Sequence, residues 1–345
     1  MPKRPTSADV AAAAGVSRTT VSFVLNEREG VKIPDETRQR VLAAAAKLDY
    51  HPNSVARQLA GGASRALGLV LRQTPEQVAN DGVLAETLRG LADAARAANH
   101  RVLVETLAPG DGHYSNLLRS GRTDGLIVSG PRYDDVELVA LVRDGFPVVI
   151  QGSLPGLDVP SVDVDNEAGA RLAVEHLLAL GHRRIACITN APLAYTAAAE
   201  RLTGYREALA AAGLPDDPDL IAEGAFDAAS GHRAVAEILA RATPEAIFVA
   251  SDVVAIGAMA GLREAGFSIP RDVSVVSFDA IPLAAYLDPP LTTIRLPAYD
   301  LGLAAGRAIL ERIGGRPVAT RTLLPTELIV RASTAPRHGA VGRPA

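Results

Sequence analysis

The spacing of apolar and polar residues changes near residue 64 and divides this chain of 345 residues into two parts. In the first part, apolar positions recur every three or four residues, which is the repeat of amphipathic helices. In the second part, short apolar runs alternate with longer helical stretches. The pattern predicts a small helical N-terminal region followed by a larger region of alternating strands and helices.

The larger region has the strand–helix alternation that is typical of parallel α/β sheets with right-handed crossovers. The apolar runs predicted as strands are 66–71, 101–107, 125–129, 147–151, 184–189, 246–250 and 273–278. The stretches predicted as helices are 84–98, 166–180, 201–212, 230–241 and 253–265.

Residues 6–26 (TSADVAAAAGVSRTTVSFVLN) read as a helix-turn-helix. Thr6 is suited to cap the first helix, with Asp9 as the acidic half of a capping box. Gly15 tolerates the left-handed backbone that a tight turn between helices needs. Ser17 is then expected to cap a second helix.

The second helix has two different faces. At 100° per residue, one face carries Val16, Thr20, Val21, Val24 and Leu25, and the other carries Arg18, Thr19, Ser22 and Phe23. The first face is suited to pack on the neighbouring helix, and the second can form hydrogen bonds with base edges in the major groove of DNA. An ordinary helical hairpin with a solvated face is the alternative for this window alone.

A third helix is predicted over 35–48, with Pro34 at its start and acids in its first turn. Its apolar stripe, which we expect to close a three-helix core, is Val41, Leu42, Ala45 and Leu48. The following segment, 50–60, contains Asn53 as a possible cap and ends at two glycines. It is too short to form a stable helix alone in water.

Charge is distributed unevenly along the chain. Residues 1–62 hold nine lysines and arginines against six acids, a net charge of +3, so the remainder carries −7 of the total of −4. A basic N-terminal region on an acidic body fits phosphate contact at one end of the molecule.

Two further observations concern the cell compartment. The single cysteine, Cys187, lies in an apolar run and is expected to pack in a strand, so no disulfide is possible within the chain. The first residues have no apolar signal region, and no apolar run approaches membrane-spanning length. We expect a cytoplasmic protein without membrane contact.

The pairing of GVSRTTVSFVLN (15–26) with YHPNSVARQLAGG (50–62) resembles the lac-repressor/galactose-repressor family of bacterial transcription regulators, and the match continues to about residue 331. The resemblance implies that the recognition helix presents Arg18, Thr19 and Phe23, with Thr20 and Ser22 near the backbone. It also implies that 53–60 becomes a hinge helix on operator binding. The set of expected DNA-contacting residues is Thr6, Ser17, Arg18, Thr19, Thr20, Ser22, Phe23, Asn26, Tyr50, Asn53, Ala56 and Leu59.

The chemistry of these residues agrees with the roles that the resemblance implies. Arginine donates two hydrogen bonds to guanine, and a threonine methyl group or Phe23 can contact the methyl group of thymine. Leu59, supported by Ala56, would insert into a minor-groove step and kink the duplex. Phe23 is a departure from the family, which often has a polar residue there, and a purely structural role is the alternative.

The resemblance further implies an effector domain similar to periplasmic sugar-binding proteins, with two α/β lobes of parallel strands, three crossovers and a ligand cleft between the lobes. The expected domains are a helix-turn-helix at 1–51, a hinge at 52–63, an effector-binding and dimerisation domain at 64–332 and a disordered tail at 333–345. Lobe one is expected at about 64–162 and 294–320, and lobe two at about 163–293 and 321–332.

Ligand sites in parallel sheets lie at the carboxyl ends of strands. Polar residues that follow predicted strands are Ser129, Gln151, Ser251, Asp252 and Asp279. Strand ends are often polar for other reasons, so these residues indicate a site mainly as a set.

The resemblance implies that Arg201 anchors the effector, that Asp279 accepts its hydroxyl groups and that Phe226 stacks on it. Weaker candidates are Gln151, Ser129, Ser251, Tyr195 and Thr196. An arginine and a carboxylate can hold neighbouring hydroxyls, and an aromatic face suits a sugar ring. The alternatives are a salt bridge between lobes for Arg201 with Asp279, and a core position for Phe226.

Two departures bear on the effector. The loop RQTPEQVAND (72–81) lacks the aromatic motif that is common in sugar-responsive members, and Leu296 stands where a polar contact sometimes occurs. A carbohydrate is the preferred effector class, and a nucleobase or another small metabolite is the alternative.

Other protein classes lack their expected signals. The sequence has no phosphate-binding loop, no strand followed by GxGxxG, no nucleophile elbow and no zinc-ligand spacing, so we expect no enzyme, cofactor or metal. A solute-binding protein for uptake would need a secretory signal. In the family that this chain resembles, members that form tetramers do so through a C-terminal coiled coil, and the tail here has no leucine heptads, so the resemblance implies a homodimer.

These observations predict a sequence-specific transcription regulator, in the role of a repressor. It is expected to bind a pseudo-palindromic operator in double-stranded DNA, with a small effector controlling its affinity.

Overall fold

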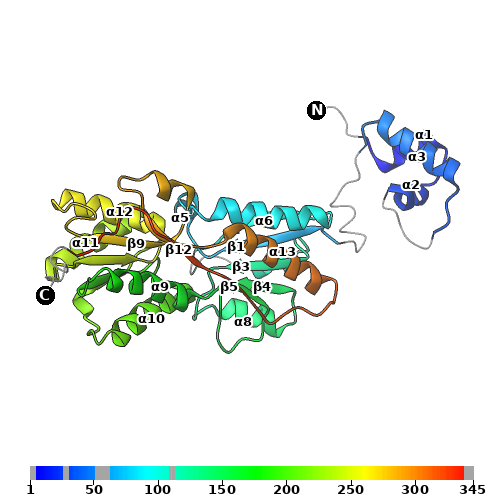
Figure 1. Cartoon of the computed structure of the whole chain (residues 1–345). Helices are drawn as coiled ribbons and strands as arrows, with labels where there is room; N and C mark the ends of the chain where they lie inside the picture. Colours follow the sequence, from blue (N-terminus) through cyan, green and yellow to red (C-terminus); the bar gives the residue numbers. More distant parts are fainter. Residues whose placement is uncertain (1–4, 26–30, 51–62, 109, 111–112, 338–345) are drawn as a thin grey trace, which may run out of the picture. The chain divides into compact units, whose positions relative to one another are not determined.

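The computed structural model describes residues 5–25, 31–50, 63–108, 110 and 113–337, which belong to two compact units, Met1–Ser64 and Arg65–Ala345 (Figure 1). No helix in these ranges is both long and apolar enough to cross a membrane.

The first unit contains the three predicted helices, α1 (Ser7–Ala14), α2 (Arg18–Leu25) and α3 (Asp35–Lys47). Their shared core is formed by Val10, Val21, Val24 and Val41 with several alanines. The prediction for Leu42 is wrong, because its side chain is 43% exposed. Val41, Ala44 and Ala45 of α3 face the core instead, and Leu42 lies a quarter turn away from that face.

The first sheet of the second unit has six parallel strands in the order β11-β5-β4-β3-β1-β2, and we call this part lobe one. The strands are β1 (Ala66–Leu71), β2 (Arg101–Thr106), β3 (Gly125–Ser129), β4 (Val148–Gln151), β5 (Ser161–Val164) and β11 (Arg321–Leu324). Leu67 and Leu69 of β1 pack under α6 (Leu84–Ala97) and α13 (Ala298–Ile313), whereas Val70 faces α7 (Ser115–Arg119) and α8 (Val136–Arg143). This alternation places one apolar layer on each face of the sheet. A short helix, α5 (Pro75–Ala79), follows β1.

The second sheet has the order β12-β10-β9-β8-β6-β7, and we call this part lobe two. Its strands are β6 (Ile185–Ile188), β7 (Ile221–Ala222), β8 (Ala246–Val249), β9 (Ser274–Asp279), β10 (Thr292–Arg295) and the antiparallel β12 (Glu327–Ile329). Helices α9 (Asn166–Ala179) and α10 (Thr196–Ala211) cover one face, and α11 (Ala228–Arg241) and α12 (Asp252–Glu264) cover the other. Two 3-10 helices, η1 (Pro218–Leu220) and η2 (Pro282–Tyr286), complete the lobe.

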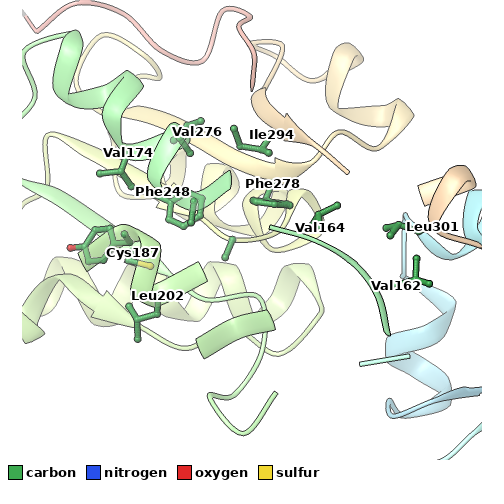
Figure 2. Close-up of a cluster of buried hydrophobic side chains, with 14 of the residues drawn as sticks. Val162, Val164, Val174, Cys187, Leu202, Phe248, Val276, Phe278, Ile294 and Leu301 are labelled. Atoms are coloured by element: carbon green, nitrogen blue, oxygen red, sulfur yellow. The ribbon is translucent and has the colours of Figure 1, made fainter. Parts of the chain in front are cut away.

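A buried apolar cluster links the two lobes (Figure 2). In lobe two it contains Cys187, Phe248 and Phe278, and it continues to Val162 of β5 and Leu301 of α13 in lobe one. Cys187 is fully buried in a strand, as predicted, and burial raises the pKa of its thiol.

The chain passes between the lobes three times: after β5, after β10 and between β11 and β12. The number of crossovers agrees with the expectation, but the lobe boundaries differ. Residues 163–164 and 321–324 pair in the sheet of lobe one, and 294–295 pair in the sheet of lobe two. The segment 321–324 was expected in lobe two and is the largest correction, because its pairing partner β5 is distant in the sequence.

The predicted start of the disordered tail at residue 333 is also wrong. Ser333 is fully buried, its hydroxyl donates to the carbonyl of Val275 at 2.6 Å, and it accepts from the amide of Thr292 at 2.8 Å. The amide of Arg337 donates to the carbonyl of Leu180 at 2.9 Å. These hydrogen bonds fix 333–337 along lobe two, and residues 338–345 lie outside the described ranges.

Candidate functional site

Local hydrogen bonds define the helix-turn-helix. The amide of Thr6 donates to Asp9 Oδ2 at 2.7 Å, and the amide of Asp9 donates to Thr6 Oγ1 at 3.4 Å, which completes the predicted capping box. Gly15 ends α1 at φ +66°, a conformation that favours glycine. The amide of Thr20 donates to Ser17 Oγ at 3.1 Å, so Ser17 caps α2 as expected.

The two faces of α2 have the predicted exposure. Val21 and Val24 are buried against α1 and α3, whereas Arg18, Thr19 and Ser22 are exposed. Phe23 is half-buried, so part of its ring stays accessible. The outward face therefore presents a guanidinium group, two hydroxyls and part of an aromatic ring.

The other predicted DNA-contacting residues have different surroundings. Thr6 is exposed, and the hydroxyl of Thr20 lies 2.9 Å from that of Ser17. Tyr50 is half-buried and packs against the core of the first unit. Asn26, Asn53, Ala56 and Leu59 lie outside the described residues.

A cavity of about 170 Å³ lies between the two lobes of the second unit. It is lined by seven of the eight predicted effector residues: Ser129 and Gln151 from lobe one, and Tyr195, Arg201, Phe226, Ser251 and Asp279 from lobe two. Leu296 also lines it, so the apolar departure noted in the sequence does lie at the site.

Arg201 is held in place by three groups. Its Nε donates to Asn166 Oδ1 at 2.9 Å, and its Nη1 donates to the carbonyl of Ala250 at 2.6 Å and lies 3.6 Å from Asp279 Oδ1. The guanidinium also lies 3.8 Å from the centroid of the Phe278 ring. The ion pair with Asp279 exists, but it does not connect the lobes, because both residues belong to lobe two.

Asp279 has an unusual backbone for a residue with a side chain, φ +118°. Such a conformation costs roughly 1–3 kcal/mol and is often found at functional sites. Its Oδ2 accepts from the amide of Asp252 at 3.3 Å. Burial raises the pKa of Asp279 to about 7 in spite of the nearby Arg201, and the carboxylate of Asp252 adds to the increase.

Tyr195 and Phe226 form an aromatic wall of the cavity. Their rings meet edge to face with centroids 4.9 Å apart, and Arg132 lies 4.7 Å from the Tyr195 centroid. The Tyr195 hydroxyl donates to the carbonyl of Arg72 in lobe one. Phe226 therefore both packs against Tyr195 and lines the cavity.

Thr196 is the one predicted effector residue that does not line the cavity. It is fully buried, and both its amide and its hydroxyl donate to the carbonyl of Pro131, at 3.2 and 3.4 Å. Its role is to connect the start of α10 with the loop after β3.

The lobes are in direct contact around the cavity. The amide of Tyr133 donates to the carbonyl of Ala194 at 3.0 Å, and Gln77 Nε2 donates to the carbonyl of Ala225 at 3.1 Å. These bonds, with those of Tyr195 and Thr196, join lobe one to lobe two on both sides of the site.

Six polar lining residues were not predicted: Gln73, Asp81, Thr87, Asp163, Asn166 and Asn190. Gln73 and Asp81 lie in the loop after β1 that the sequence had marked only as a departure from the family. Asn190 directly follows the predicted strand 184–189, so its position in the sequence indicated a ligand site in the same way as the positions of Ser251 and Asp279. Asp163 and Asn166 adjoin β5, which the apolar pattern did not reveal.

The lining of the cavity is rich in carboxyl groups. Burial, together with the neighbouring Glu200 carboxylate, raises the pKa of Asp163 to about 7, and burial also raises the pKa of Asp81. Across the described ranges, no cluster of three His, Cys, Asp or Glu side chains is placed to hold a metal ion.

Comparison with known proteins identifies similar chains for both units. Residues 6–53 match the family described as bacterial regulatory proteins, lacI family, and residues 174–334 match the periplasmic binding protein-like domain. The HTH-type transcriptional regulator CelR of Thermobifida fusca is 35% identical over 338 residues, which cover 96% of this chain and 98% of CelR.

Solved structures of regulators of this family are also similar to this chain. The CelR–cellobiose complex aligns with a TM-score of 0.74 at 35% identity, covering 96% of this chain and all of the other. The lac repressor dimer bound to operator and the anti-inducer ONPF aligns with a TM-score of 0.83 at 32% identity, with the same coverage.

Proposed function

The chain belongs to the lacI family of DNA-binding transcriptional regulators, and from that premise we propose that it is a homodimeric repressor whose affinity for a pseudo-palindromic operator is controlled by a carbohydrate bound between its lobes. Relatives are transcriptional regulators rather than enzymes. As a regulator of chromosomal genes, the protein would act in the cytoplasm.

The DNA-binding part of the proposal rests on the outward face of α2. Arg18 would read guanine, and Thr19 and Phe23 would contact neighbouring bases in the major groove, with Thr20 and Ser22 near the phosphates. Thr6, Ser17, Asn26 and Tyr50 would contact or position the backbone. Asn53, Ala56 and Leu59 would form the hinge that enters the minor groove.

One observation supports the effector part most strongly. Arg201 and Asp279 line the same cavity as Gln151 and Ser129 of the opposite lobe. Donors and acceptors from both lobes are thus available to a ligand with several hydroxyl groups, and Tyr195 and Phe226 offer an aromatic wall to its apolar face. CelR, whose complex with cellobiose is known, is a relative with a carbohydrate ligand.

The proposed mechanism couples the two sites through the arrangement of the lobes. A ligand in the cavity contacts both lobes and changes the balance between arrangements that retain or break the interlobe bonds of Gln77 and Tyr133. That balance would control whether the hinge can fold on DNA. Because coupling is reciprocal, about 1–3 kcal/mol would change operator affinity roughly 5- to 150-fold.

The function is tested with operator fragments selected from random DNA by the full-length chain. We expect carbohydrate addition to change operator affinity, and we expect Arg18→Ala to lose about 1–3 kcal/mol of discrimination at one base position in each half-site. The measurement is fluorescence anisotropy on the selected operator and its single-base variants.

The control is Arg40→Ala, which removes an exposed arginine of α3. It is expected to weaken binding to all sequences alike, because a phosphate contact carries no base preference. An Arg18→Ala protein with unchanged base preference would contradict the role of α2, and an operator affinity insensitive to every carbohydrate would contradict the effector class.

We expect the protein to be a dimer in solution, as the similar lac repressor is in its complex with operator. Sedimentation velocity at micromolar concentration without DNA should show a species of about twice the chain mass of 35.9 kDa. A tetramer would contradict this assembly.

A further inference from the structure

The described lining of the effector cavity has more negative than positive groups. It contains the carboxyls of Asp81, Asp163 and Asp279, and Arg201 is the one cation among the described lining residues. The guanidinium of Arg201 already serves Asp279, Asn166 and the carbonyl of Ala250.

Asp163 lacks a cation of its own. Its carboxylate is 7% exposed and accepts from the amide of Val164 at 2.8 Å and from Asn166 Nδ2 at 3.2 and 3.3 Å. None of the ion pairs among the described residues includes Asp163, whereas Asp279 is paired with Arg201. Arg201 lowers the pKa of Asp163 electrostatically, but it forms its ion pair with Asp279, so the charge of the buried Asp163 carboxylate is only partly compensated.

A second observation indicates that the missing partner is a ligand. The oxygens Gln73 Oε1 and Asn190 Oδ1 are buried in side chains that are 9% and 7% exposed, and neither has a hydrogen-bond partner in the described structure. Gln151 Oε1 is likewise buried and has no hydrogen-bond partner in the described structure. All three residues line the cavity, so its unsatisfied groups are acceptors.

We infer that Asp163 determines effector specificity by accepting a positively charged amino group, so that the effector is a polyhydroxylated amine of the hexosamine class rather than a neutral or acidic sugar. The inference rests on the proposed function, because it concerns the ligand of the same cavity. The cation is an organic one, since the described residues offer no cluster that could hold a metal.

The groups that face Asp163 explain the preference. Glu200 and Arg201 approach from α10, and Asn166 approaches from the start of α9. Burial and the Glu200 carboxylate raise the pKa of Asp163 to about 7, so the empty site holds its negative charge poorly. An ammonium group beside Asp163 would favour the ionised carboxylate, and an anionic ligand would add to the repulsion.

The test compares matched ligands on the full-length protein by isothermal titration calorimetry at pH 7. The probes are D-glucosamine, D-galactosamine and D-mannosamine, their parent hexoses D-glucose, D-galactose and D-mannose, and the acids D-glucuronate and D-galacturonate. We expect at least one hexosamine to bind roughly 10- to 150-fold more tightly than its parent hexose, as for a hydrogen bond between charged groups. The acids should bind more weakly than the neutral sugars.

Two variants locate the effect. Asp163→Asn keeps the shape of the side chain and should bring the affinity for the hexosamine down to that for its parent hexose, so that the preference disappears. Asp165→Asn is the matched control, because Asp165 is exposed and caps α9 by accepting from Ala168 at 2.8 Å. It should retain the preference.

The outcomes separate this inference from the proposed function. A hexose that binds as tightly as its hexosamine, or a preference that persists in Asp163→Asn, would overturn the inference and leave a carbohydrate-controlled regulator. Tightest binding by a hexuronate would also overturn it. Absence of binding by all eight probes would count against the carbohydrate effector and the inference together.

Discussion

Arg201→Met is expected to destabilise the effector unit by about 3–5 kcal/mol, because it removes one partner of a buried ion pair and leaves the other charge without compensation. Arg201 is 6% exposed, and its loss frees Asp279, Asn166 Oδ1 and the carbonyl of Ala250 at once. The corresponding decrease in the melting temperature is on the order of 10 °C. Thermal unfolding followed by circular dichroism measures it.

The matched control lies on the same helix. Arg206→Met removes an arginine whose Nε lies 2.9 Å from Asp216 at the surface, with both side chains about half exposed. A surface pair of this kind contributes about 0–1 kcal/mol. Equal melting temperatures for the two variants would show that Arg201 has no special structural role. Any folded Arg201→Met protein should also lose stabilisation by the effector, since the anchoring cation is gone.

Asp163→Asn is expected to make the effector unit more stable than the wild type by roughly 2–4 kcal/mol at pH 8, and by only about 1–2 kcal/mol at pH 5. The ordinary carboxyl pKa is 3.8, and burial raises the pKa of Asp163 to about 7. Between these values the folded protein keeps a proton that the unfolded chain has released. The free energy of unfolding of the wild type therefore falls as the pH rises through this range, and the loss is complete above pH 7.

Asparagine cannot ionise, so the free energy of unfolding of the variant does not decrease with pH for this reason. Urea unfolding of both proteins at pH 5 and pH 8 provides the measurement, and Asp165→Asn serves as the control for an exposed position. The control should differ from the wild type by less than about 0.5 kcal/mol at both pH values. A wild type and an Asp163→Asn protein with the same pH dependence would mean that the carboxyl is not buried as the structure shows.

These two predictions describe one property of the site, which is that its empty form is electrostatically unfavourable. Asp163 and Asp279 both have raised pKa values, and Asp279 also has a strained backbone. A ligand that supplies donors and positive charge would remove part of this cost when it binds. Effector binding should therefore stabilise the lobes strongly, which favours a regulatory equilibrium that responds to ligand.

Several strands of the fold were predictable because their signals are local. The apolar runs at 66–71 and 125–129 coincide with β1 and β3, and the helix expected at 84–98 corresponds to α6 within one residue. Each of these elements is long or strongly apolar, so its pattern does not depend on distant partners. Helix α10 begins at Thr196 rather than at 201, because its first turn is anchored by Pro131 of the other lobe.

The strands that were missed depend on distant pairing. β7 has only two residues. β5, β10 and β11 have four residues each and β12 has three, and the sequences of these four strands mix polar with apolar residues. β11 is a strand because Arg321 pairs with Ser161, far back in the chain. A four-residue segment has too few positions to show a period, so only its partner strand decides its conformation.

The sequence by itself determined the helix-turn-helix, the alternating α/β body and seven of the residues that line the cavity. The caps of Thr6 and Ser17, the turn at Gly15 and the polar ends of the strands are all set by neighbours within a few positions. The tertiary structure alone decided which lobe each crossover segment joins, that Thr196 donates to Pro131, and that Asp163 is a buried carboxylate outside the ion pairs of the described residues. The reason is that burial and charge pairing depend on groups brought together from distant parts of the chain.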